Sequence, residues 1–303
     1  MSDIKLFSIA NGSVTQLAGT SVAVEKSLQQ LIETHLEELL GVRFLRSEYS
    51  TGKSHGGRID TLGLDENGYP VIVEYKRSLN ENVINQGLYY LDWLMDHKGE
   101  FTLLVQTKLG KETADGIEWD NPRLLCVAGD FTKYDAYAVQ QIDRNIELIR
   151  YRRYGDELLL FERANTLISA GGDTPPKEVK PPKPPYKTVT QVLDEANSDL
   201  RDRYESLKAF LLALGDDVQI NTLKYYLAFK RIKNFACVEF RTQQNNILVY
   251  VKVDPDSVPL EDRFTRDVRK IGHYGTGDLE ITIGNDEDLE KAKDLLVKSY
   301  EAS

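Results

Sequence analysis

The chain has 303 residues, which at about 100 to 200 residues per domain favours two domains. With 41% hydrophobic residues, 28% charged residues and a formal net charge of −10, it has the composition of a globular protein. No apolar run approaches the roughly 18 residues needed to cross a bilayer, which excludes a membrane transporter and any membrane partner. The N-terminus does not read as a secretory signal, and two distant cysteines cannot form a disulfide framework, so we expect a cytoplasmic protein.

Three common catalytic motifs are missing. The four histidines and two cysteines form no cluster with zinc-ligand spacing, and there is no G-x-S-x-G nucleophile elbow. Gly52-Lys53-Ser54 resembles the end of a phosphate-binding loop, but the first glycine of that motif would fall on Ser47. The sequence therefore argues against a zinc enzyme, a serine hydrolase and a P-loop protein.

A proline-rich stretch divides the chain. Six of the ten prolines lie between Pro175 and Pro185, and such a segment favours an extended, semi-rigid spacer. We therefore predict a first domain at 1–167, a linker at 168–187 and a second domain at 188–303. The part before residue 166 carries 18 basic and 25 acidic residues, and the part after 187 carries 16 and 21. Neither domain could bind nucleic acid by bulk positive charge.

Hydrophobic periodicity predicts a first domain of alternating helices and strands, typical of an α/β layer with a mixed sheet. A helix that ends at Gly41 leads into a β-hairpin with Asn67-Gly68 at its turn, and a second helix follows the hairpin. The predicted strands are 4–9, 14–17, 58–64, 69–75, 101–106 and 123–128, and the predicted helices are 22–40, 81–96 and 134–144.

The second domain is predicted to be a smaller α+β domain. A helix with one apolar face precedes three strand candidates, and two more helices flank a further strand. The predicted helices are 200–214, 260–271 and 286–300, and the predicted strands are 224–230, 235–241, 247–253 and 279–283.

Charged residues on the first-domain hairpin form the most informative pattern. In an antiparallel hairpin the numbers of opposed residues have a constant sum, and a loop at 66–68 makes Asp60 and Glu74 cross-strand neighbours. Lys76 follows Glu74 by two residues and shares its face. The apolar run 71–73 is typical of a strand buried on both faces, so these charges would lie in a low-dielectric environment.

Two adjacent carboxylates repel each other unless a proton or a cation lies between them. Their hard oxygen atoms suit Mg²⁺ or Mn²⁺, which keep open positions for water and for a phosphate of the substrate. Lys76 could position the attacking water and neutralise charge on phosphorus. The alternative to a catalytic site is a structural one, in which Asp60, Glu74 and Lys76 form a solvated strand face with cross-strand salt bridges.

With these residues, the first domain resembles the PD-(D/E)xK nuclease superfamily, and within it the NucS-like endonucleases. The resemblance rests on GRID, VIVEYKR and QGLYY, together with the preceding helix EKSLQQLIETHLEELL, and covers about residues 22–130. It implies a restriction-endonuclease-like core with a mixed central sheet. It also implies a DNA endonuclease that requires Mg²⁺ or Mn²⁺. The second domain resembles a small bacterial domain of unknown function, which implies no chemistry.

Carried over by position, the resemblance assigns roles to individual residues. Asp60 and Glu74 would be metal ligands, and Lys76 would position water. Gln86 would be the catalytic core-helix glutamine, with Tyr90 as its companion and as a candidate for nucleic-acid contact. The acid of the first helix would be Glu25, with Glu33 as the fallback.

Further residues are candidates for nucleic-acid contact. Arg58, opposite Lys76, could bind phosphate or pair with an acid. The basic and aromatic run 149–154 is better explained as a solvated strand edge. Four basic residues of the second domain have helical spacing and could form a phosphate-binding face, although a charged outer face of a surface helix is the simpler reading. They are Arg263, Arg266, Arg269 and Lys270.

The leading functional hypothesis is a metal-dependent endonuclease acting on DNA in repair, restriction or phage defence. A module that keeps the nuclease fold but only binds nucleic acid or a protein partner is the alternative. The sequence does not separate DNA from RNA as substrate. A homodimer would suit double-strand cutting.

Overall fold

The computed structural model describes residues 4–20, 26–52, 56–75, 83–164 and 187–303. Glu25, Lys76 and nearly all of the predicted linker lie outside the described residues. The chain divides into two compact units, Met1–Thr166 and Leu167–Ser303. Among the described residues, no helix combines the length and apolar character that a membrane span requires.

Strands and helices alternate in the first unit, as the periodicity predicts. Its strands are β1 (Leu6–Ala10), β2 (Ser13–Leu17), β3 (Gly19–Thr20), β4 (Val42–Ser50), β5 (Arg58–Asp65), β6 (Pro70–Tyr75), β7 (Arg123–Ala128), β8 (Asn145–Tyr154) and β9 (Leu158–Arg163). Its helices are α1 (Lys26–Thr34), α2 (Leu36–Leu40), α4 (Val83–Asp96), α5 (Lys98–Leu109), α6 (Lys111–Asp115) and α7 (Lys133–Gln140).

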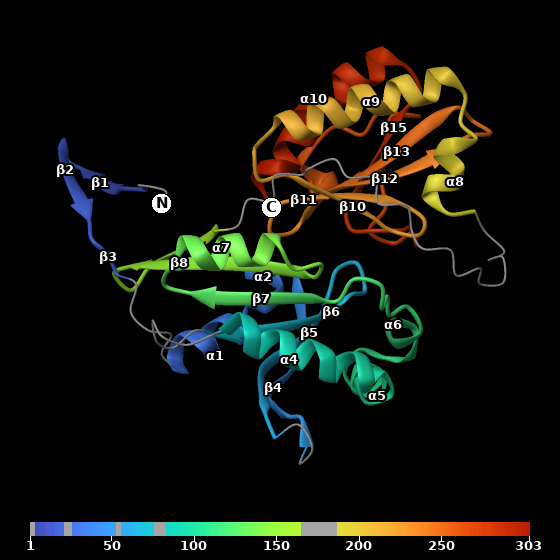
Figure 1. Ribbon diagram of the computed structural model, residues 1–303. Coiled ribbons are helices and arrows are strands. Elements are labelled where there is room, and N and C mark those ends of the chain that lie inside the picture. Colours follow the sequence, from blue (N-terminus) through green and yellow to red (C-terminus); the bar gives the residue numbers. More distant parts are fainter. Residues whose placement is uncertain (1–3, 21–25, 53–55, 76–82, 165–186) are drawn as a thin grey trace. The chain divides into compact units, whose positions relative to one another are not determined.

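Seven strands of the first unit form one mixed sheet, in the order β3-β8-β7-β6-β5-β4 with β9 paired to β8. The pairs β6–β7 and β7–β8 are parallel and the remaining pairs are antiparallel. The predicted mixed α/β layer is therefore confirmed. Helix α4 lies along this sheet, packed on β6 and β7 (Figure 1). Its apolar stripe, including Leu91 and Leu94, joins Leu62, Ile72 and Leu124 in a buried core.

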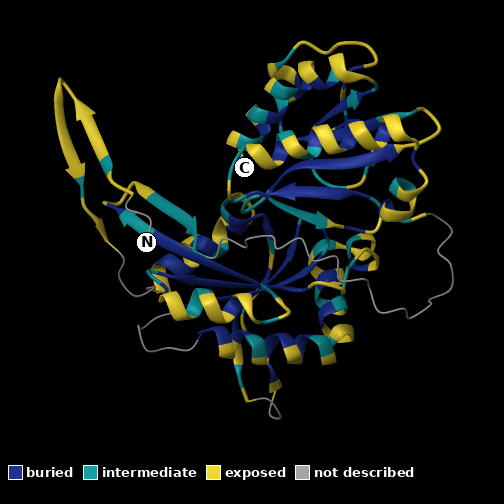
Figure 2. Cartoon of the chain, turned by 45° about the horizontal axis from the view of Figure 1, so that its top comes forward, coloured by how far each residue is buried: buried dark blue, intermediate teal, exposed yellow. Residues whose placement is uncertain are grey.

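The hairpin formed by β1 and β2 is a separate two-stranded sheet. Its side chains are almost all exposed, as the yellow strands in Figure 2 show, and Phe7, Ile9 and Val14 are among them. Both strands were predicted from their strand-like sequences. Within the described part of the chain, however, the apolar side chains of this hairpin are not buried against another element.

Two predicted elements of the first unit differ in the structure. Residues 101–106 were predicted as a strand but belong to helix α5, because Phe101 and Val105 are buried at helical spacing on the same side. The β-rich sequence Phe-Thr-Leu-Leu-Val misled the prediction, since tertiary packing overrides weak local propensity. The long helix predicted at 22–40 is divided in the described part, where α1 ends at Thr34 and α2 begins at Leu36.

The second unit is an antiparallel sheet covered by helices on one face. Its strands are β10 (Gln219–Thr222), β11 (Leu227–Lys230), β12 (Asn234–Arg241), β13 (Asn246–Val251), β14 (Thr265–Asp267) and β15 (Leu279–Ile283). Its helices are α8 (Val189–Asp194), α9 (Ser198–Ala213), a short 3-10 turn at Pro255–Ser257 and α10 (Asp286–Glu301).

The sheet of the second unit has the order β10-β11-β12-β13-β15-β14. Apolar side chains of alternate positions, such as Phe229, Val249 and Ile281, pack with Leu207 and Leu296 of α9 and α10. The predicted helices 200–214 and 286–300 are confirmed in place. Residues 260–271 are not a helix, because residues 265–267 form strand β14.

Candidate functional site

The two strands of the β5–β6 hairpin separate at the predicted carboxylates. Their backbone pairing runs from Leu64 opposite Pro70 to Thr61 opposite Val73. At the next position the Asp60 N–H donates to Glu74 Oε1 at 3.1 Å. These carboxylates are therefore cross-strand neighbours, as the hairpin numbering predicts.

A second hydrogen bond makes this linkage reciprocal, because the Tyr75 N–H donates to Asp60 Oδ2 at 3.0 Å. Each carboxylate thus accepts a backbone N–H of the other strand, in place of the ladder that ends beside it. Asp60 is 9% exposed and Glu74 is 1% exposed. Strand β6 also stays paired to β7 here, with Glu74 opposite Cys126, so Glu74 is held between two strands.

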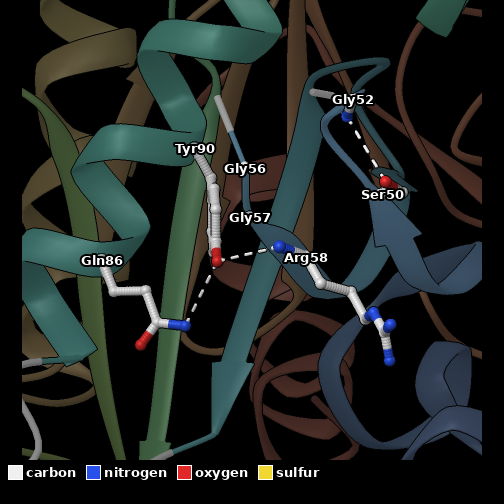
Figure 3. Close-up of a pocket in the computed structure, with 7 residues that line it drawn as sticks. All are labelled: Ser50, Gly52, Gly56, Gly57, Arg58, Gln86 and Tyr90. Carbon is white, nitrogen blue, oxygen red and sulfur yellow. Dashed lines mark hydrogen bonds between the residues drawn. The ribbon is translucent and has the colours of Figure 1, made fainter. Parts of the chain in front are cut away.

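Helix α4 places the predicted Gln86 and Tyr90 beside the start of β5. The Tyr90 hydroxyl accepts the Arg58 N–H at 3.1 Å, and Gln86 Nε2 donates to the same hydroxyl at 3.4 Å (Figure 3). Tyr90 is 5% exposed, so it holds β5 in place rather than offering a surface for DNA. The structure therefore brings Gln86 and Tyr90 to a point two residues from Asp60.

An open depression of about 700 Å³ lies at this corner. Arg58 extends at its rim with a side chain that is 66% exposed, and it forms a weak, exposed pair with Glu48 at 3.4 Å. The depression is lined by Ser50, Gly52, Gly56, Gly57, Arg58, Gln86 and Tyr90, which Figure 3 draws together.

Gly57 is required by the close approach of Tyr90, because a Cβ at this position would lie 2.5 Å from a ring carbon. We expect Gly57→Ala to displace the Tyr90 ring and to lower the free energy of unfolding by about 1–3 kcal/mol. Urea unfolding followed by tryptophan fluorescence measures this. The matched control is Gly99→Ala in α5, where an added Cβ meets nothing within 4 Å. Equal free energies of unfolding in the two variants would show that the Tyr90 ring can move aside without destabilising the fold.

Of the two candidate acids in the first predicted helix, Glu25 and Glu33, the structure describes Glu33, which lies in α1. Its Oε1 accepts hydrogen bonds from Thr61 Oγ1 at 2.6 Å, Ser47 Oγ at 2.8 Å and Gln29 Nε2 at 3.0 Å. Thr61 is adjacent to Asp60, so Glu33 contacts the opposite face of β5 from the Asp60 side chain.

Three acidic side chains affect the electrostatic environment of the Tyr75 hydroxyl. Burial raises the pKa of the Tyr75 hydroxyl well above its usual value, and three neighbouring carboxylates add to the effect. They belong to Glu33, Asp60 and Glu74. The fallback acid Glu33 thus takes part in the same electrostatic environment as the two hairpin carboxylates.

A buried ion network anchors the other end of the hairpin. Arg123 of β7, 2% exposed, donates to Asp65 Oδ2 at 2.9 Å and to Glu147 Oε1 at 2.8 Å, and Arg163 also contacts Glu147. Asp65 Oδ1 in turn accepts the N–H groups of the hairpin turn. This network was not predicted from the sequence, and its available signal was Asp65, two residues before the Asn67-Gly68 pair.

The run 149–154 is not a strand edge, so that prediction is wrong. It belongs to β8, which pairs with β7 on one side and with β9 on the other. Its Arg150 is 8% exposed and forms ion pairs with Asp130 and Glu162, both at 2.9 Å. Arg150 therefore takes part in the packing of the sheet rather than in a surface for nucleic acid.

The predicted phosphate-binding helix in the second unit is also wrong. Residues 265–267 form β14, an edge strand on β15, and Arg263 has a φ of 64°, which a helix does not allow. Arg266 pairs with Glu280 at 2.8 Å. Of the four predicted basic residues, Lys270 lies just after this strand and shares no helical face with the others.

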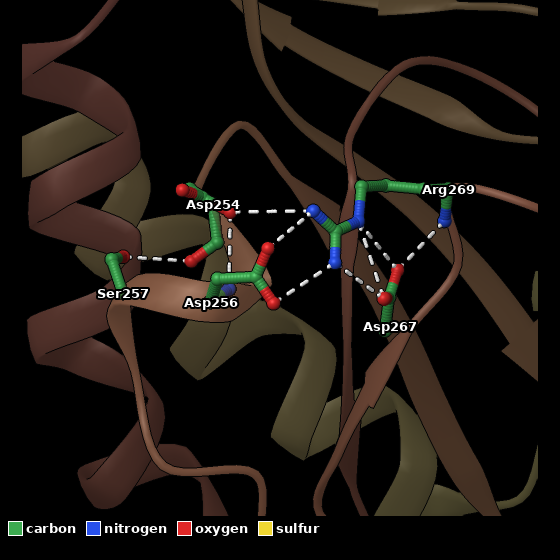
Figure 4. A network of polar contacts seen from close by, with 5 residues as sticks. All are labelled: Asp254, Asp256, Ser257, Asp267 and Arg269. Carbon is green, nitrogen blue, oxygen red and sulfur yellow. Dashed lines mark hydrogen bonds and ion pairs between the residues drawn. The ribbon is translucent and has the colours of Figure 1, made fainter.

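Arg269 is surrounded by acids. It contacts Asp256 and Asp267, both at 2.8 Å, and Asp254 at 3.6 Å (Figure 4). A guanidinium shared among three carboxylates in this way is neutralised locally, which removes the reason to expect phosphate there.

Arg269 holds the pKa of the Asp256 and Asp267 carboxyls below their usual value, chiefly by hydrogen bonding. Stability from these pairs is present above about pH 4, the unfolded pKa of aspartate, and is lost as pH falls through the lowered folded pKa. Arg269→Gln is expected to raise both pKa values, as measured by carboxyl ¹³C shifts during an acid titration. Arg263→Gln, whose arginine side chain is 93% exposed, is the control. Unchanged pKa values in Arg269→Gln would contradict the assignment.

The donor set at the hairpin fits a small divalent cation. Two buried carboxylates supply hard oxygen atoms, and Mg²⁺ commonly binds through one or two carboxylates with water and phosphate completing its shell. Within the described ranges, no group of three or more His, Cys, Asp or Glu side chains could hold a metal. A cation here would therefore rely on the Asp60–Glu74 pair.

Comparison with known proteins covers both units. A family model described as a domain of unknown function (DUF5655) matches residues 189–303, which is the second unit from α8 onward. An uncharacterized protein of Haemophilus influenzae is 29% identical, over 97% of this chain and 98% of that protein. No solved structure matches the chain. The relative thus pairs the same two units, and neither match names an activity.

Proposed function

We propose that the chain is a divalent-metal-dependent endonuclease that hydrolyses phosphodiester bonds in DNA, with a first unit of the PD-(D/E)xK, restriction-endonuclease-like type. The observation that carries this proposal is the pair of buried carboxylates, Asp60 and Glu74, at the point where β5 and β6 separate. The neighbouring Gln86 and Tyr90, on the helix after the hairpin, support it.

Burial of two like charges side by side is unfavourable unless a proton or a cation lies between them, and a solvated strand face would leave the two carboxylates exposed rather than 9% and 1% exposed. Their burial instead favours a role that needs a concentrated negative charge in a low-dielectric environment. Asp60 and Glu74 would hold Mg²⁺ or Mn²⁺. Such an ion, when bound, lowers the pKa of coordinated water and neutralises charge on the phosphate.

The chain's own residues have separable tasks in this proposal. The reciprocal hydrogen bonds orient the two carboxylates before substrate arrives, so little reorganisation is needed during reaction. Tyr90 fixes the start of β5, and Arg58 at the rim of the depression would bind a phosphate next to the scissile one. Lys76, assigned from the sequence, would position the attacking water.

The acidic balance of the first unit agrees with this use of metal. A domain without a basic surface attracts DNA weakly through bulk charge, so cations must bridge its carboxylates to phosphate. Contact between the Asp60–Glu74 site and DNA should therefore depend on the divalent cation, as hydrolysis does.

The test is cleavage of plasmid, linear, single-stranded, flapped and mismatched DNA, with RNA of matched sequence, in Mg²⁺, in Mn²⁺ and in excess EDTA. Cleavage that needs the cation would support the proposal and identify the substrate. Absence of cleavage from every substrate, with no Mg²⁺ or Mn²⁺ binding by calorimetry, would overturn it in favour of a nuclease-fold binding module.

A further inference from the structure

The second unit has a sheet face that its long helices leave uncovered. Across this face run Cys237, Tyr250 and Glu280, which are opposed to one another on β12, β13 and β15, and Arg266 continues the row on β14. All three of the first-named side chains are buried, at 0%, 2% and 5% exposure. The cover over this row includes the loop at 271–278.

That loop is seated by specific contacts. The His273 ring stacks on Tyr250 at 4.3 Å between centroids and 10° between planes. The Thr276 N–H donates to Cys237 Sγ at 3.4 Å, and a Cβ at Gly275 would lie 2.6 Å from Cys237. The loop therefore has little freedom, and it presents the Tyr274 ring from a fixed position with 45% of the residue exposed.

A cavity of about 420 Å³ opens beside Tyr274. Its lining includes Tyr274 and Tyr225, whose ring centroids are 4.9 Å apart, and the exposed β12–β13 turn with its two glutamines. Its volume is in the range of small-ligand sites.

Charge in this cavity is arranged around Glu239, which is 5% exposed. Glu239 Oε2 pairs with Arg241 at 3.0 Å, and Oε1 accepts the Tyr274 N–H at 3.4 Å. Burial raises the pKa of the Glu239 carboxyl. Glu239 thus links the loop to the strand and orients a guanidinium, 49% exposed in its side chain, at the mouth of the cavity.

These groups match the parts of a nucleotide. A flat exposed ring can stack with a base, amide side chains of Gln243 and Gln244 can donate and accept at its edge, and an arginine at the mouth can contact phosphate. A base paired within a duplex could not enter a cavity of this kind, because both of its faces are stacked. The chemistry therefore favours an unpaired nucleotide.

We propose that this cavity binds a nucleotide of single-stranded DNA, with its base on Tyr274 and its phosphate at Arg241. The choice of a strand over a free nucleotide rests on the endonuclease function proposed for the first unit. Recognition through stacking explains how a unit with more acidic than basic residues could hold DNA.

The test is fluorescence anisotropy of the full chain with a fluorescein-labelled single-stranded DNA 12-mer in EDTA, so that binding is measured without cleavage. Tyr274→Ala is expected to weaken binding by roughly tenfold or more, and Tyr274→Phe to restore it, since a phenyl ring also stacks. Gln244→Glu changes an exposed turn residue without disturbing the core, and its added charge should also weaken binding. Arg263→Glu makes a charge change at a 93% exposed side chain outside the cavity and should bind as wild type.

Each outcome has a defined meaning. Wild-type affinity in both Tyr274→Ala and Gln244→Glu would overturn the inference, as would equal loss in Arg263→Glu. Competition by mononucleotides as strong as by the 12-mer would assign the site to free nucleotide instead of a strand. Cleavage assays of the same variants in Mg²⁺ separate the two proposals, because binding that depends on Tyr274 with no cleavage would retain this site and reject the nuclease.

Discussion

If the proposed function is right, Asp60→Asn is expected to abolish metal-dependent cleavage, with a loss of roughly 1,000-fold or more, because a neutral amide replaces the carboxylate proposed as a metal ligand in a buried site. The asparagine keeps an oxygen that can accept the Tyr75 N–H, so the hairpin should retain its geometry. It also removes one of two buried like charges. Activity should therefore be lost while the free energy of unfolding is maintained.

The measurement compares cleavage rates and urea unfolding of wild type, Asp60→Asn and the control Asp115→Asn, which changes an exposed acid of α6. Calorimetry with Mg²⁺ or Mn²⁺ adds a reading that is independent of turnover. Metal binding retained in Asp60→Asn, together with wild-type cleavage, would remove Asp60 from the site.

Arg123→Leu is expected to lower the free energy of unfolding of the first unit by about 3–5 kcal/mol, because Asp65 and Glu147 would remain buried beside an apolar side chain. Both tryptophans, Trp93 and Trp119, belong to this unit, so tryptophan fluorescence during urea unfolding follows it selectively.

A matched control is available on the same sheet. Arg153→Leu on β8 removes an arginine paired with the 98% exposed side chain of Asp156 and should cost less than about 1 kcal/mol. A similar small loss in Arg123→Leu would show that the buried network is replaceable by packing, as occurs when buried ion pairs contribute little net stability.

Local patterns predicted those parts of the fold that depend on contacts near in sequence. The hairpin numbering placed Asp60 opposite Glu74, and apolar stripes located α4, α9 and α10 closely, because these signals need only the periodicity of one or two elements. The mixed character of the sheet also followed from the order of elements.

Features set by distant contacts were not predictable in this way. Residues 101–106 have the composition of a strand, and only packing of Phe101 and Val105 makes them helical. The spacing of Arg266 and Arg269 resembled a helix face. In the structure, Arg266 pairs with Glu280 of the neighbouring strand and Arg269 pairs with Asp256 of the short 3-10 turn. The hydrogen bonds of Glu33 with Ser47 and Thr61 were not predictable either, because the sequence could not align the strands of these two residues with α1.

The anchoring of the β5–β6 turn by Arg123 limits how the hairpin can change during evolution. Side chains alternate between the two faces of each strand, so gain or loss of a single residue between Asp65 and Asp60 would turn Asp60 to the face of β5 that Glu33 contacts. Changes of length are tolerable only outside this interval, or in compensating pairs. We therefore expect the number of residues from turn to carboxylate to be constrained more tightly than the identity of the apolar residues between them.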